Sequence, residues 1–276
     1  MRIARFSLPD TAADAGVVRF GLVDGEPEQP DSMVIAELAG HPFTPDPQPT
    51  GRAWPLDEVR LLAPVLPSKI AAIGRNYADH AKELGHEVPE VPITFLKPST
   101  SVIGPNETIA YPAASKEVGY EAELAVVIGR LCREVPLARV PEVVLGYTCA
   151  NDVTARDLQR AEVQWGRAKG FDTFCPLGPW IETAVDLIGA SGAGDPADLA
   201  ITCTVNGELR QAGRTSQMIR DVADLVAHIS EAMTLLPGDV ILTGTPAGVG
   251  PLQIGDTVSV TIEDIGTLTN RVVSRD

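Results

Sequence analysis

Apolar residues are grouped along the chain in short runs, a pattern that indicates buried strands rather than long helices. Residues 124–128 (Leu-Ala-Val-Val-Ile) form a near-continuous apolar run, as expected of a strand covered on both faces. We predict this strand over residues 119–130 and a second buried strand over residues 143–154. Ser216–Leu235 is a longer segment with a different pattern. Its apolar residues recur at three- and four-residue spacing and predict an amphipathic helix capped by Asp221.

The remaining strands are short and separated by turn residues. Lys69–Gly74 and Val240–Thr243 are compact apolar segments, and Asn206-Gly207 is a strong hairpin signal. Residues 258–262 and 268–273 are expected to pair as a terminal hairpin. From residue 66 onward strands dominate, which predicts a mixed α+β, mainly β fold with its sheet rolled into a barrel or sandwich.

The first 65 residues are interpreted as a small N-terminal domain and linker, and residues 66–276 as one larger domain. Arg2–Ser7 and Val17–Val23 are strand-like and precede Pro- and Asp-rich sequence. Three prolines within residues 51–67 exclude a long helix, so that stretch is interpreted as linker. Residues 165–181 are interpreted as turn-rich and residues 187–196 as a loop.

Charge and composition narrow the class of protein. A formal net charge of −15 over 276 residues disfavours nucleic acid as a partner, because its phosphates would be repelled. The chain has no apolar run long enough to span a membrane, and its first residues lack the apolar core of a signal peptide. The four cysteines include no C-x-x-C pair and are interpreted as reduced thiols. We therefore expect a cytoplasmic protein with no membrane partner.

Acidic residues on the two longest apolar strands are candidate metal ligands. Glu121 and Glu123 are two residues apart, so both carboxylates point to one face of a strand, and Asp152 lies near the end of the next strand. Like charges on a buried strand need compensation, and carboxylate oxygens suit Mg²⁺, Mn²⁺ or Ca²⁺ better than Zn²⁺. The alternative is a solvated strand end with two surface glutamates.

His80 and Glu83 are a candidate catalytic pair on a short helix predicted over residues 78–85. At three-residue spacing they share a helix face, so the carboxylate could orient the imidazole as a general base for water. Spacing alone favours the ordinary alternative, an exposed helix pair. Lys97 at the end of a strand and Lys169 beside a glycine are each suited to bind an anion or to be solvated.

Seven stretches, in order along the chain, resemble a known family. They are IGRNYADH (73–80), FLKPST (95–100), YEAELAVVIG (120–129), NDVTARDLQ (151–159), AKGFD (168–172), VNGELRQ (205–211) and PGDVILTGTPAGVG (237–250). Together they resemble the fumarylacetoacetate hydrolase family over about residues 61–276. The resemblance is to its short members, the acylpyruvase-like and 2-hydroxyhepta-2,4-diene-1,7-dioate isomerase-like proteins.

The resemblance implies a fumarylacetoacetase-like β-roll or barrel, usually a homodimer, with Mg²⁺ or Mn²⁺ held by Glu121, Glu123 and Asp152. It implies that His80 and Glu83 activate water in hydrolytic and decarboxylating relatives, and that Lys169 lies near the metal-bound oxygen. The residues expected around the substrate are Arg75, Tyr77, Lys97, Arg156, Gln159 and Thr245.

The activity expected on this basis is metal-dependent cleavage of a C–C bond in a small 2-oxo acid through a metal-bound pyruvate enolate. The reaction would be acylpyruvate hydrolysis or oxaloacetate-type decarboxylation. One alternative is 5-carboxymethyl-2-hydroxymuconate or 2-hydroxyhepta-2,4-diene-1,7-dioate isomerisation in aromatic catabolism. Others are a non-catalytic 2-oxo acid binding protein and a calcium-stabilised structural protein. The same enolate chemistry serves all the enzymes, and the His80–Glu83 pair favours cleavage.

Overall fold

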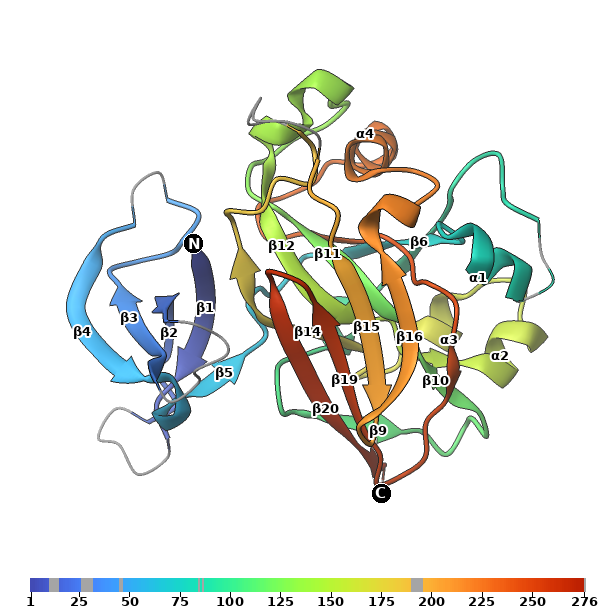
Figure 1. Ribbon diagram of the computed structural model, residues 1–276, viewed down its shortest axis with the longest axis horizontal. Coiled ribbons are helices and arrows are strands. Elements are labelled where there is room, and N and C mark those ends of the chain that lie inside the picture. The colour runs from blue at the N-terminus through green and yellow to red at the C-terminus, as the bar shows by residue number, and fades with distance from the viewer. Residues whose placement is uncertain are drawn as a thin grey trace.

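The computed structural model describes residues 1–9, 15–25, 32–44, 47–83, 85, 87–189 and 196–275. Strands dominate the architecture and form three sheets, with few helices (Figure 1). This confirms the predicted mixed α+β, mainly β fold. No helix in the described part of the chain has the length and apolar character that crossing a membrane requires.

The largest sheet runs through the whole molecule. In spatial order its strands are β4 (Pro49–Pro55), β3 (Val34–Leu38), β2 (Val18–Asp24), β1 (Arg2–Ser7), β14 (Cys175–Glu182), β12 (Val144–Asn151), β11 (Ala122–Ile128), β17 (Val240–Leu242), β6 (Ile70–Gly74) and β7 (Ile93–Lys97). Two short strands lie off this path: β5 (Arg60–Leu62) pairs with β1, and β8 (Val102–Ile103) pairs with β14. Every residue of the central strand β11 is buried, as its unbroken apolar sequence predicts.

Two smaller sheets and the helices cover this frame. The five-stranded sheet has the order β16 (Glu208–Arg214), β15 (Ala200–Val205), β19 (Thr257–Ile262), β20 (Gly266–Ser274) and β9 (Thr108–Tyr111); the three-stranded sheet has the order β13 (Thr154–Ala155), β10 (Val118–Tyr120) and β18 (Gly250–Pro251). The α-helices are α1 (Ala78–Glu83), α2 (Arg156–Ala161), α3 (Gly166–Lys169) and α4 (Val222–Ala232). The 3₁₀ helices are η2 (Leu56–Glu58), η3 (Ser99–Ser101), η4 (Leu137–Glu142) and η5 (Thr215–Gln217).

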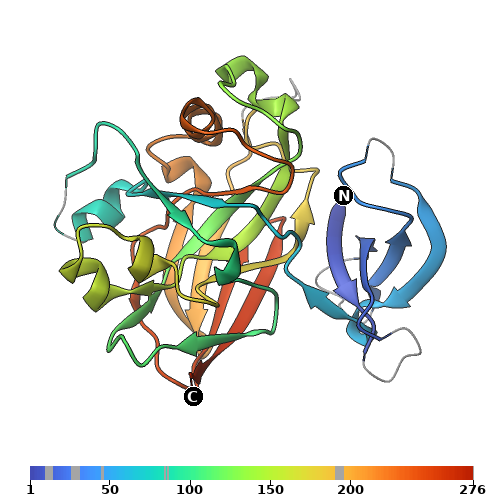
Figure 2. The ribbon, with the colours of Figure 1, turned by 180° about the vertical axis from the view of Figure 1, so that it is seen from behind.

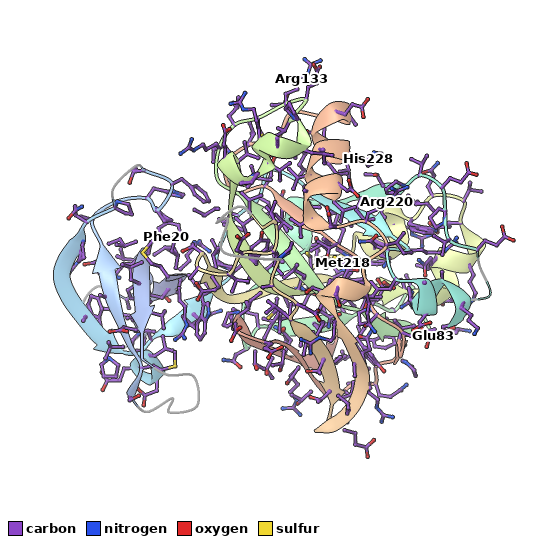
Figure 3. All side chains as sticks on the ribbon, turned by 45° about the horizontal axis from the view of Figure 1, so that its top comes forward. Phe20, Glu83, Arg133, Met218, Arg220 and His228 are labelled. Atoms are coloured by element: carbon purple, nitrogen blue, oxygen red, sulfur yellow. The ribbon has the colours of Figure 1, made fainter. Side chains whose placement is uncertain are left out.

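Strands β1–β4 form a lobe beside the rest of the molecule, which Figure 2 shows from behind. The lobe has its own apolar core, which includes Phe6 and Ile35 and takes in Trp180 from β14. Figure 3 places Phe20 in this lobe at the opposite end of the molecule from Glu83 on α1. The N-terminal lobe therefore lies away from the end of the sheet that carries the candidate catalytic residues.

Three local expectations need correction. Residues 51–67 are not only a linker, because they contain the rest of β4, η2 and β5. Residues 165–181 are not merely turn-rich, because they contain α3 and most of the fully buried strand β14. The expected helix over residues 216–235 is shorter, although Asp221 does cap it by accepting the Asp224 N–H at 2.8 Å. Of the predicted loop at residues 187–196, positions 190–195 lie outside the described residues.

Strand register brings the candidate residues to one end of the large sheet. Antiparallel pairing of β11 with β12 sets Ala122 opposite Asn151. Glu121 and Glu123, at the start of β11, therefore lie beside Asp152, which directly follows the end of β12. Strands β6 and β17 run parallel, and β17 is antiparallel to β11. The chain after β6, which leads into α1, and the glycine-rich segment after β17 therefore reach the same end of the sheet.

Candidate metal centre and active-site cavity

Glu121, Glu123 and Asp152 form a buried carboxylate cluster. They are 4%, 2% and 1% exposed, and one oxygen from each lies within 4.8 Å of the others. Carboxylate oxygens bound to one divalent ion at about 2.0–2.6 Å have spacings of this size. The alternative of two surface glutamates on a solvated strand end is therefore wrong.

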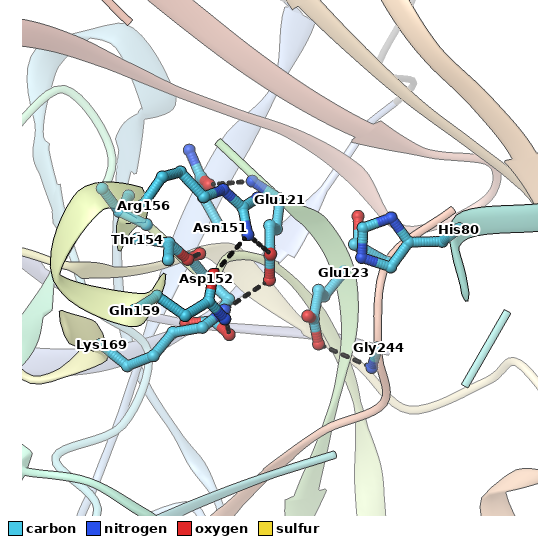
Figure 4. A network of polar contacts seen from close by, with 12 residues as sticks. His80, Glu121, Glu123, Asn151, Asp152, Thr154, Arg156, Gln159, Lys169 and Gly244 are labelled. Carbon is cyan, nitrogen blue, oxygen red and sulfur yellow. Dashed lines mark hydrogen bonds and ion pairs between the residues drawn. The ribbon is translucent and has the colours of Figure 1, made fainter. Parts of the chain in front are cut away.

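Three buried cations surround two of these carboxylates, and Figure 4 shows two of them, Lys169 and Arg156. Lys169 Nζ donates to Glu121 Oε2 at 2.7 Å and to Asp152 Oδ2 at 2.6 Å. Arg156 Nη1 lies 2.7 Å from Glu121 Oε1, and Lys97 Nζ donates to Asp152 Oδ1 at 2.5 Å. Although burial alone would raise the pKa of Glu121, Lys169 and Arg156 outweigh it and hold that pKa well below its usual range.

Glu123 is the carboxylate that these cations leave least compensated. It accepts a hydrogen bond from the Gly244 backbone N–H, which donates to Oε2 at 2.7 Å. Burial, together with the like charges of Asp152 and Glu121, raises the pKa of Glu123 well above its ordinary value. A divalent cation at the cluster would supply the positive charge that Glu123 lacks. The three carboxylates offer oxygen ligands, which suit Mg²⁺ or Mn²⁺. The residues therefore fit the metal that the sequence predicts.

The His80–Glu83 pair forms on α1. His80 is buried, its Nδ1 lies 3.1 Å from Glu83 Oε2, and the second oxygen of Glu83 accepts the Gly248 N–H at 3.0 Å. Glu83 thus fixes the imidazole and also holds α1 to the glycine-rich segment after β17. The ordinary alternative of an exposed pair is wrong for His80, because tertiary packing covers a residue whose helical spacing gives no sign of burial.

One cavity of about 410 Å³ joins the carboxylate cluster to His80. It is lined by Ile73, Gly74, Arg75, His80, Phe95, Glu121, Glu123, Asp152, Arg156, Gln159, Arg160, Trp165, Lys169 and Thr245. The structure thus brings together the three expected metal ligands, two of the expected catalytic residues and four of the six residues expected around the substrate.

Tyr77 and Lys97 lie elsewhere. Tyr77 is 2% exposed and lines a separate pocket beside Gln217 and Pro246, where burial raises the pKa of its hydroxyl. Lys97 is 1% exposed and is bonded to Asp152 and to the Lys169 carbonyl, so it supports a candidate ligand from behind. Because the end of β7 is covered by the segment around α3, Lys97 does not face the cavity as its place at a strand end suggests.

Other cavity residues carry little sequence signal. Phe95 shares a strand face with Lys97 by two-residue spacing, which is the cue that could have found it. Trp165, Gly74 and Arg160 come from segments whose approach depends on the tertiary fold. The Gly244 N–H lies in the glycine-rich segment after β17, and it meets Glu123 only through the pairing of β17 with β11.

Two known families match the chain along its length. Residues 69–273 match the family described as fumarylacetoacetate (FAA) hydrolase C-terminal, and residues 1–64 match the Rv2993c-like N-terminal family. The chain is 54% identical to protein Rv2993c of Mycobacterium tuberculosis over 275 residues, covering 100% of this chain and 99% of that protein.

Two further relatives have names that describe an activity. The mitochondrial oxaloacetate tautomerase Fahd2a of Rattus norvegicus is 46% identical over 228 residues, covering 79% of this chain and 71% of the relative. A crystal structure of 5-carboxymethyl-2-hydroxymuconate delta-isomerase from Mycobacterium smegmatis superimposes with a TM-score of 0.87 at 53% identity, covering all of both chains.

Proposed function

The chain belongs to the fumarylacetoacetate hydrolase family, and from that premise we propose that it is a Mg²⁺- or Mn²⁺-dependent enzyme that cleaves a C–C bond in a small 2-oxo acid. The main support for this proposal is that a buried carboxylate cluster and a buried histidine, oriented by Glu83, line one cavity. The cluster suits a metal, and the histidine suits activation of water. A binding protein would have no need of an oriented base beside the ligand.

Glu121, Glu123 and Asp152 would hold the ion. When bound, it would supply a Lewis acid for the 2-oxo oxygen as negative charge develops there. Lys169 contacts two of these carboxylates and lines the cavity, so its ammonium can stabilise the same developing charge.

His80 would be the general base of the hydrolytic reaction. Because Nδ1 is bonded to Glu83, the proton is held on that nitrogen and Nε2 is left to accept one from water. The hydroxide adds to the carbonyl carbon beyond the reacting bond, and the C–C bond then breaks with its electron pair moving to the pyruvate fragment. That fragment takes up a proton to give pyruvate, and the acyl fragment leaves as a carboxylic acid.

Tautomerisation or isomerisation is the second candidate, and the names of the rat and mycobacterial relatives favour it. The same base would then move a proton between carbon and oxygen, or between carbons, with no attack by water. A metal at the carboxylate cluster would suit hydrolysis and isomerisation equally. The two activities are therefore distinguished by their products.

A substrate panel tests the proposal. Metal-stripped protein would be given acetylpyruvate, fumarylpyruvate, oxaloacetate and a hydroxymuconate-type dienol, with and without Mn²⁺ or Mg²⁺. Loss of enol absorbance and release of pyruvate or CO₂ would be followed together. We expect metal-dependent pyruvate release. Absorbance loss without either product would move the assignment to the isomerase class, and no turnover on the panel would contradict an enzymatic role on these acids.

A further inference from the structure

A buried glutamine on β16 faces the strand that carries the carboxylate cluster. Strand β16 is an edge of the five-stranded sheet (Figure 1). All seven residues of β16 are described, and Gln211 alone is buried, at 0% exposure, whereas Leu209 is 63% exposed. A strand ordinarily buries its apolar side chains and exposes its amides. A β-bulge lies beside Gln211, because Arg210 has no residue opposite it on β15, and bulges re-aim side chains.

The Gln211 carboxamide takes the place of a neighbouring strand at the end of β11 that carries Glu121 and Glu123. Strand β17 pairs with the middle of β11 but not with its first residues. At that end the Ala122 N–H donates to Gln211 Oε1 at 2.9 Å, and the Ala122 carbonyl accepts a hydrogen bond from Thr245 Oγ1 at 2.8 Å. Two side chains therefore satisfy backbone groups that a paired strand would otherwise satisfy.

The same carboxamide also fixes the Thr245 hydroxyl. Gln211 Nε2 donates to Thr245 Oγ1 at 2.7 Å and to the Pro246 carbonyl at 2.7 Å, so both ends of the amide are bonded. Because Thr245 in turn donates to Ala122, the three residues form a closed network, and they are 0–3% exposed. A buried network with its bonds satisfied makes the segment that it holds rigid.

Rigidity at this end of β11 affects which cation fits the cluster. Glu121 and Glu123 flank Ala122, so a shift of Ala122 would change the spacing of the two carboxylates. Mg²⁺ demands nearly ideal octahedral geometry at about 2.0–2.1 Å, whereas Ca²⁺ accepts variable geometry at about 2.3–2.6 Å. A rigid cluster therefore favours the smaller ion, and a loosened cluster loses that preference.

We propose that Gln211 is a positioning residue that sets metal selectivity. By holding Ala122 and Thr245, it keeps the Glu121 and Glu123 carboxylates at a spacing that suits Mg²⁺ better than Ca²⁺. The inference rests on the proposed function in placing a divalent ion at the carboxylate cluster. Gln211 is not among the residues that line the cavity, so it acts through the strand and not by contact with the substrate.

Displacement of Mn²⁺ measures this effect without turnover. Metal-stripped protein is loaded with Mn²⁺, and electron paramagnetic resonance of the free ion follows its displacement by Mg²⁺ and by Ca²⁺. Gln211→Met keeps the approximate length of the side chain and removes its hydrogen bonds. We expect the Mg²⁺ dissociation constant to rise about tenfold, as is typical when a group that orients metal ligands is lost, and that of Ca²⁺ to rise less than about threefold.

Thr245 variants test the same network from its other side. Thr245→Val removes the hydroxyl that bonds to Ala122 and changes the side-chain shape little, so it should shift the selectivity in the same direction. Thr245→Ser keeps the hydroxyl and should keep the native selectivity. Because both side chains hold Ala122, the double variant of Gln211→Met and Thr245→Val should shift selectivity by less than the product of the single effects.

Asn270→Leu is the matched control for loss of a buried carboxamide. Asn270 on β20 is 2% exposed, and its Nδ2 donates to the carbonyls of Gly104 and Glu107 at 2.9 and 2.8 Å. Its substitution should lower the melting temperature of the metal-free protein and leave both dissociation constants unchanged. A selectivity shift that also appeared in Asn270→Leu would come from general destabilisation and would overturn the inference.

Unchanged dissociation constants in Gln211→Met, or equal losses for Mg²⁺ and Ca²⁺, would also overturn the inference. These results are separable from those of the substrate panel. Metal-dependent turnover with native selectivity in Gln211→Met would leave the proposed function standing and remove the role of Gln211. A selectivity shift without turnover on the panel would do the reverse, and a native protein that bound no divalent ion would overturn both.

Discussion

Replacing Glu123 by glutamine should stabilise the metal-free protein and weaken its response to metal. Glu123 is 2% exposed, accepts the Gly244 N–H and faces the like charges of Glu121 and Asp152. Glutamine has nearly the same shape, still offers an oxygen to Gly244 and carries no charge. The substitution therefore removes electrostatic repulsion from the cluster while preserving its packing.

The expected gain follows from the cost of a poorly compensated buried group, about 1–3 kcal/mol. For a domain of roughly 150–250 residues, 1 kcal/mol corresponds to about 2–4 °C, so the melting temperature should rise by about 2–12 °C. Because folding raises the pKa of Glu123 above its ordinary 4.5, its ionised form costs stability as pH rises above that value. The advantage of the glutamine variant should therefore be present at pH 7 and shrink as pH falls toward 4.5.

Metal offsets the advantage of the glutamine variant. At a free Mn²⁺ concentration of 100 times the dissociation constant, binding to the folded state alone contributes about 2.7 kcal/mol. The native protein should gain this, and Glu123→Gln should gain much less because it has lost an anionic ligand. Differential scanning calorimetry at pH 7, with EDTA and then with Mn²⁺, measures both effects.

Glu182→Gln is the control for removal of a buried glutamate elsewhere. Glu182 on β14 is 6% exposed and is paired with the N-terminal ammonium and Arg2. Its substitution should lower the metal-free melting temperature and leave the Mn²⁺ response unchanged. A Glu123→Gln variant that melts below the native protein in EDTA and retains the full Mn²⁺ response would show that Glu123 neither costs stability nor binds the ion.

Three other predictions concern residues around the site and the fold. His80→Ala should abolish turnover while keeping the Mn²⁺-induced rise in melting temperature; an active variant would remove His80 from the mechanism. Lys97→Met should lower the free energy of unfolding by about 3–5 kcal/mol, because it breaks a buried ion pair with Asp152, and urea denaturation that showed no loss would contradict this. Burial alone would raise the pKa of Asp239, but hydrogen bonds led by that from Lys69 outweigh it and lower that pKa. The stabilisation by Asp239 is therefore present above pH 3.8 and is lost as pH falls through the lower pKa of the folded protein. In urea titrations Asp239→Asn should cost about 1–3 kcal/mol of unfolding free energy at pH 7 and less at pH 3.

The carboxylate cluster could be predicted from sequence because its geometry is local. The two-residue spacing of Glu121 and Glu123 sets their side chains on one strand face, and β12 is adjacent in both sequence and space. Asp152 therefore joins the cluster through a single antiparallel pairing. The His80–Glu83 contact is equally local, since one helical turn forms it, although the burial of His80 depends on packing that its spacing does not report.

The Trp165 side of the cavity could not be predicted because its residues come from separate segments. Trp165 meets Gly74 across some ninety residues of chain, and the contact exists only because β6 and β7 pair beside α3. Strand β14 was not expected for a related reason: its glycine and prolines suggest turns, yet its pairing with β12 is irregular between Tyr147 and Cys149 and accommodates Pro179 there. The homodimer, the domain boundary at residue 66 and the cytoplasmic location stay predictions.

The central claim is that metal held by the buried carboxylates and a base on α1 together break a C–C bond. Its most direct test is pyruvate release from acetylpyruvate by protein stripped of metal, before and after Mn²⁺ is restored. We expect no release without metal, release on restoration, and none in His80→Ala at either stage. Release that is unaffected by stripping, or that persists in His80→Ala, would contradict it.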